Sequence, residues 1–139
     1  MMKENMETKK RIVRAMVLHP GTPVDILFRG AESNLDVINN IQKLLNRAEY
    51  LTKTYGIPGY SREVKDGFKK IKEFISAINV EEQAAALSRK YDVAEADAEH
   101  AVASALIYGA YILAPGVTVQ CNLARTQLTV RKQGAGSYA

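Results

Sequence analysis

The stretch SREVKDGFKKIKEFISAI, residues 61–78, decides the predicted fold because it encodes one helix with two chemically distinct edges. Its apolar residues recur every third or fourth position, which places them on one side of an α-helix: Val64, Phe68, Ile71, Ile75 and Ile78. Its cations recur in the same way beside that stripe: Arg62, Lys65, Lys69 and Lys72. Ser61 is a favourable N-cap. The stretch therefore predicts an amphipathic helix with a cationic edge for a phosphate backbone, and a merely solvated face is the alternative interpretation.

Three more helices follow from the same periodicity and capping rules. A helix over residues 34–54 begins after Ser33, and a shorter one, ending near Lys90, begins after Asn79. A fourth, rich in alanine, is predicted from Asp92 and Glu95 to about Ala114, and its small side chains allow another helix to approach closely. Four amphipathic helices with short links predict a four-helix bundle over residues 34–114.

Proline and glycine mark where the remaining segments begin and end. The sequence HPGTP at residues 19–23 divides an N-terminal arm, residues 1–33, into two short helices, the first capped by Thr8. After Pro115-Gly116, residues 115–139 form a tail in which alternating residues 117–123 and then 127–130 predict a small β-hairpin or extended tail, with a flexible end. The predicted fold class is all-α. Gly67 is unfavourable inside a helix, so we expect a close approach there by another helix or by nucleic acid.

Composition excludes several classes of function. The chain has 139 residues and a net charge of +4, with no apolar stretch long enough to span a membrane. Its single cysteine, Cys121, cannot form an internal disulfide, and His19 and His100 are far apart in sequence with no other metal ligand at a suitable spacing. The sequence therefore predicts a protein that is not an enzyme, with no catalytic residues, no metal site and no cofactor.

The charge is distributed unevenly along the chain. Residues 80–114 carry two cations and six carboxylates, whereas the segments before and after them are basic. Such asymmetry predicts one side that binds a polyanion and another that faces water or protein. The candidate DNA-binding residues are Lys9, Lys10, Arg11, Arg14, Arg29, Arg62, Lys65, Lys69 and Lys72.

Residues 55–72, YGIPGYSREVKDGFKKIK, add a resemblance to this picture. Tyr55-Gly56-Ile57, Gly59, Ser61-Arg62 and Gly67-Phe68 resemble the turn and helix start in the major coat proteins of filamentous and rod-shaped double-stranded DNA viruses of hyperthermophilic archaea. The hairpin-like tail departs from the rod-shaped members, and the chain is more similar to a subunit of a filamentous virus.

The resemblance implies a four-helix bundle with an N-terminal arm. It also implies pairing, either with an identical chain or with a paralogous coat protein, and the filamentous members favour the paralogue. Such pairs form a helical filament around linear double-stranded DNA held in A-form, and the arm and the basic helix faces contact the DNA backbone. The protein would then be located in the virion, and in the host cytoplasm during assembly.

The leading hypothesis is a structural virion protein that coats DNA through phosphate contacts without reading its sequence. The alternative is a cellular helix-turn-helix regulator, although residues 24–29 are too short and apolar for a recognition helix. A third hypothesis is a helical protein-interaction module that uses the acidic fourth helix.

Overall fold

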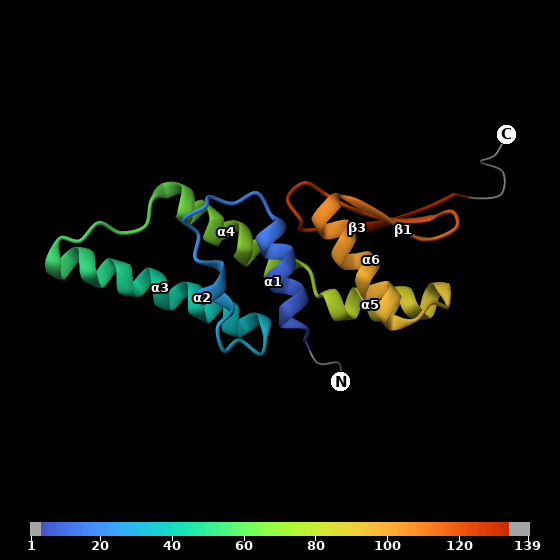
Figure 1. Ribbon diagram of the computed structural model, residues 1–139, viewed down its shortest axis with the longest axis horizontal. Coiled ribbons are helices and arrows are strands. Elements are labelled where there is room, and N and C mark those ends of the chain that lie inside the picture. The colour runs from blue at the N-terminus through green and yellow to red at the C-terminus, as the bar shows by residue number, and fades with distance from the viewer. Residues whose placement is uncertain (1–3, 134–139) are drawn as a thin grey trace.

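The computed structural model describes residues 4–133 and shows six helices and a three-stranded antiparallel sheet in that range (Figure 1). The helices are α1 (Met6–Ala15), α2 (Val24–Phe28), α3 (Asn34–Tyr55), α4 (Arg62–Ala77), α5 (Val80–Tyr91) and α6 (Glu95–Tyr108). The strands are β1 (Ala110–Ala114), β2 (Val117–Cys121) and β3 (Leu128–Lys132), paired in the order β1-β2-β3. The predicted flexible end at residues 134–139 lies outside the described residues.

Local capping explains why three helices begin where the sequence predicts. The side chains of Ser33, Ser61 and Asn79 each accept a hydrogen bond from the backbone N–H three residues later, at 3.2, 3.3 and 3.0 Å. The starts of α3, α4 and α5 are therefore confirmed. Helix α1 begins earlier than predicted, because the Asn5 side chain rather than Thr8 provides the cap, accepting from the Thr8 N–H at 3.1 Å.

The predicted fourth helix is wrong beyond Tyr108, where α6 ends. Gly109 adopts a φ of 98°, a left-handed conformation that stops the helix at little steric cost. Residues 110–114 then form β1, which is joined to β2 through Pro115 and Gly116, with Gly116 at a φ of 75°. The predicted hairpin corresponds to β2 and β3, and β1 adds a third strand. The all-α fold class is therefore wrong, and the fold is mixed α/β.

The helices also do not close into one four-helix bundle. Helices α2, α3 and α4 form one half of the elongated molecule, and α5, α6 and the sheet form the other, with α1 between them (Figure 1). The buried alanines of α6, such as Ala101 and Ala105, allow close approach by α5 and by the sheet, whose Val117 and Val119 are buried. This agrees with the predicted role of small residues in that helix.

Helices α1 and α2 of the predicted N-terminal arm pack into the core. Ile12 and Val13 of α1 and Leu27 of α2 have no exposed surface, and they belong to the same hydrophobic cluster as Ile71 of α4 and Val102 of α6. Because α1 contacts both α2 and α6, it connects the two halves of the molecule.

A close approach does occur at Gly67, but it is made by the segment between α1 and α2 rather than by another helix or by nucleic acid. A Cβ atom at Gly67 would lie 3.0 Å from the buried Oγ1 of Thr22 and 3.7 Å from a methyl group of Leu18. The absence of a side chain therefore lets this segment pack directly on α4.

A large residue at Gly67 is expected to separate the segment from α4. Gly67→Leu should lower the free energy of unfolding by about 2–3 kcal/mol, because overpacking a closed contact forces backbone shifts. Urea unfolding followed by circular dichroism measures this loss. The matched control is Asp66→Leu at the neighbouring exposed position; equal stability of the two variants would contradict the proposed packing.

Candidate nucleic-acid interface

Four of the five cations of α4 lie along one edge of the helix, here called the α4 row: Arg62, Lys65, Lys69 and Lys72. Arg62, Lys65 and Lys69 are exposed and Lys72 is half-buried. At 1.5 Å per residue the row extends over about 15 Å. Within residues 4–133 none of its members forms an ion pair with a carboxylate. The row therefore presents positive charge without a direct ion-pair partner in the described part of the chain, and the Glu73 carboxylate lines the same cavity as Lys65, Lys69 and Lys72.

Three members of the row meet at a groove between α3 and α4, here called the α3–α4 groove. Lys65, Lys69 and Lys72 line a cavity of about 500 Å³, together with Leu45 of α3 and Phe68. Glu73 and Ser76 complete this lining. A second cavity of about 400 Å³ shares Leu45 and Lys65 and extends toward Tyr60. The groove therefore has apolar side chains beside a row of ammonium groups, and Arg62 lies outside its lining.

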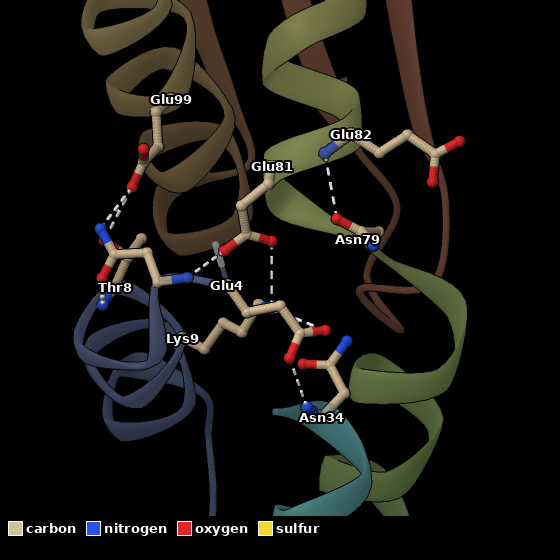
Figure 2. Close-up of polar contacts among 9 residues, drawn as sticks. Glu4, Thr8, Lys9, Asn34, Asn79, Glu81, Glu82 and Glu99 are labelled. Atoms are coloured by element: carbon tan, nitrogen blue, oxygen red, sulfur yellow. Dashed lines mark hydrogen bonds and ion pairs between the residues drawn. The ribbon is translucent and has the colours of Figure 1, made fainter. Parts of the chain in front are cut away.

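Lys9 was expected at the DNA interface, and this prediction is wrong. Its side chain is fully buried, with Nζ 3.1 Å from Oε2 of Glu81 and 3.9 Å from Oε1 of Glu4 (Figure 2). Lys9 precedes Ile12 and Val13 by three and four positions, so it lies on the apolar face of α1. That spacing was the available sequence signal.

A polar network that the sequence analysis missed surrounds Lys9 (Figure 2). The Asn5 backbone N–H donates to Oε1 of Glu81, and the Asn5 side chain donates to Oε1 of Glu99 at 2.7 Å. The Thr8 hydroxyl donates to the same Glu99 oxygen at 3.1 Å, and the Asn34 N–H donates to Glu4 at 2.9 Å. The network thus joins the start of α1 to α3, α5 and α6.

Removing the Lys9 charge is expected to destabilise the fold, because the buried Glu81 carboxylate loses its cation. Lys9→Met should lower the free energy of unfolding by about 3–5 kcal/mol, the usual loss when one partner of a buried pair is removed. The double variant Lys9→Met/Glu81→Leu should recover much of this loss, since neither charge is then buried alone. Chemical denaturation measures both changes, with Arg11→Met on the exposed face of α1 as the control. A Lys9→Met variant as stable as the control would refute the structural role.

The other candidate cations of α1 lie on its outer side. Lys10 and Arg14 both contact Oδ1 of Asp25, at 3.1 Å for Lys10 Nζ, and Arg14 donates a hydrogen bond to that oxygen. Hydrogen bonds from Lys10 and Arg14 lower the pKa of Asp25 below its ordinary value. Arg11, and Arg29 after α2, are exposed and form no ion pair within the described chain.

The structure therefore divides the candidates into separate groups rather than bringing them together. Lys10, Arg11 and Arg14, here called the α1 cluster, line a cavity of about 310 Å³ with Glu7 and Thr8. Arg11 also lines a smaller cavity that contains Glu99 and His100. None of these four cavities combines an α1 cation with a member of the α4 row.

Residues with catalytic potential are dispersed. His100 is exposed and stacks edge-on against Tyr111, with ring centroids 5.2 Å apart. Burial raises the pKa of the Cys121 thiol, which lowers its thiolate fraction. Within residues 4–133, no three His, Cys, Asp or Glu side chains are grouped so as to hold a metal ion.

None of the helices in the described range combines the length and the apolar character that crossing a bilayer requires.

Comparison with known proteins finds no match for this chain among family models, curated proteins or solved structures. The functional argument consequently depends on the residues of the chain itself, and the resemblance of residues 55–72 to viral coat proteins stays a prediction.

Proposed function

We propose that this chain is a structural subunit that coats double-stranded DNA through phosphate contacts, without sequence specificity. The observation that supports this most strongly is the α4 row, which is accessible and has no ion-pair partner within residues 4–133. Cations spaced along one helix edge can contact successive phosphates and release the condensed counterions of the duplex. Such contacts provide affinity and position but no base recognition.

The distribution of charge along the molecule also supports the proposal. The acidic segment, residues 80–114, belongs to the half formed by α5, α6 and β1, whereas the α4 row belongs to the other half (Figure 1). Glu95 and Asp97 are exposed at the start of α6. A duplex bound along α4 can thus avoid the carboxylates of residues 80–114, and this acidic segment is left for contacts between subunits.

The finer features of the proposal come from the resemblance at residues 55–72. They are a helical filament on A-form DNA, pairing with a paralogous coat protein or with an identical chain, and location in a virion of an archaeal virus. Electron microscopy of the protein mixed with linear duplex DNA tests the filament directly. Circular dichroism of the DNA in such mixtures tests the A-form.

The structure provides no support for the helix-turn-helix alternative. Helix α2, the element that would read bases, has five residues, and its Leu27 and Phe28 are buried. A recognition helix needs exposed polar side chains that reach base edges in the major groove. We therefore do not propose a sequence-specific regulator.

Neutralising the lysines of the α4 row is expected to weaken DNA binding and reduce its dependence on salt. In Lys65→Gln/Lys69→Gln/Lys72→Gln, the slope of log affinity against log salt should become shallower by about 3, because about 0.9 is lost per phosphate contact on B-DNA. Fluorescence anisotropy with a duplex, repeated at several salt concentrations, measures affinity and slope together.

The matched control removes three lysines outside the α4 row: Lys43→Gln/Lys70→Gln/Lys90→Gln. It has the same net charge as the test variant and should retain most of the affinity and the slope. Equal losses in both variants would contradict a localised interface. Protection confined to one DNA sequence in a footprinting experiment would contradict a coating function.

A further inference from the structure

The α1 cluster already holds an anion, and that anion belongs to the chain itself. Asp25 of α2 places one carboxylate oxygen, Oδ1, against both Lys10 and Arg14. We propose that the α1 cluster is a second phosphate-binding site, and that Asp25 occupies it as an internal phosphate mimic that restrains DNA binding. The regulatory part of this inference rests on the proposed DNA-coating function.

The geometry fits an oxyanion held by two cations. Lys10 and Arg14 are four residues apart on α1, so their side chains extend from the same face of the helix. A carboxylate and a phosphodiester each carry one negative charge shared by two oxygens, and guanidinium groups bind both kinds of anion. A phosphodiester that reaches this position can therefore replace Asp25 without any change of charge.

The site is reachable by a macromolecule. The Asp25 and Arg14 side chains are 66% and 54% exposed, in contrast to the fully buried Lys9 of the same helix. Arg11 has no ion pair within residues 4–133 and lines the same cavity as Lys10 and Arg14, so it provides a third cation beside the two that Asp25 engages. Glu7 also lines this cavity, and its carboxylate opposes anion binding to a similar extent in every variant discussed below.

The backbone of α2 keeps the carboxylate in place. Leu27 and Phe28, which follow Asp25 in this short helix, are buried against the core, so the helix that bears Asp25 is anchored. Only the exposed side chain has to rotate for the site to open. Since exposed ion pairs are weak and are further weakened by salt, a polyanion can displace the carboxylate at small cost.

The consequence is that the α1 cluster contributes less to DNA affinity than its charges predict. DNA must compete with Asp25 for Lys10 and Arg14, and Arg11 alone in the cluster is available without competition. Removing the Asp25 charge should therefore strengthen DNA binding more than removing a carboxylate that forms no ion pair, although both changes raise the net charge by one unit.

The test compares Asp25→Asn with Glu32→Gln, a control that changes the net charge equally at an exposed carboxylate with no ion pair in the described chain. At low salt, Asp25→Asn should raise the affinity for duplex DNA about three- to tenfold, the range that one or two released surface pairs allow. Glu32→Gln should change it by no more than about twofold. Arg14→Gln should cost little in the otherwise unchanged protein and should remove most of the gain in the Asp25→Asn background.

Equal gains in Asp25→Asn and Glu32→Gln would overturn the proposal, as would a gain that persists in Asp25→Asn/Arg14→Gln. A titration with inorganic phosphate tests the anion site independently of the proposed DNA-coating function. The measurement is the NMR chemical shift of the backbone amides of residues 10–14. The anion site is established if phosphate shifts these signals in Asp25→Asn and shifts them much less in the unchanged protein. This result would hold even if no variant bound DNA, and the failure to bind DNA would then refute only the coating function. Absence of such shifts in Asp25→Asn would refute the site itself.

Discussion

The buried ion pair between Lys9 and Glu81 is the contact on which the placement of α1 depends. Burying two charges is costly, and the cost is offset only where the geometry is close and further polar groups surround the pair. Here the other carboxylate oxygen of Glu81 accepts from the Asn5 backbone N–H, and the Glu4 carboxylate lies 3.9 Å from Lys9 Nζ (Figure 2). Because the pair tolerates little displacement, it fixes both the position and the rotation of α1. With α1 so placed, Lys10 and Arg14 reach Asp25 of α2, and Arg11 lines a cavity with Glu99 and His100 of α6.

Much of the helical structure was predictable because its determinants are local. A capping side chain acts within three residues, and an apolar stripe is visible in the spacing of one segment, as in α4. Strand β1 was not predictable in the same way, since Ala110–Ala114 becomes a strand only by pairing with β2. Nevertheless, Gly109 and the Pro115-Gly116 pair on either side of it were signals of a break and a turn.

The candidate interface shows the same division between local and non-local information. The α4 row was predictable because helix periodicity alone places its members together. The α3–α4 groove depends on how two helices pack, and the pairing of Asp25 with Lys10 and Arg14 depends on the path of residues 16–23, neither of which has a simple sequence pattern. Lys9 was misassigned because positive charge was given more weight than its position on the apolar face of α1.

The nine candidate cations fall into three groups. Lys9 is buried with Glu81, Lys10 and Arg14 are paired with Asp25, and Arg11, Arg29 and the α4 row form no ion pair within residues 4–133. A few exposed contacts per chain give only weak binding at physiological salt, because each contact is opposed by counterions. Neighbouring copies on one duplex raise each other's effective concentration, so the contacts of a single chain can be individually weak. Candidate cations that are dispersed over α1, the end of α2 and α4 are thus consistent with the proposed coating function, in which assembly supplies the affinity that a single chain lacks.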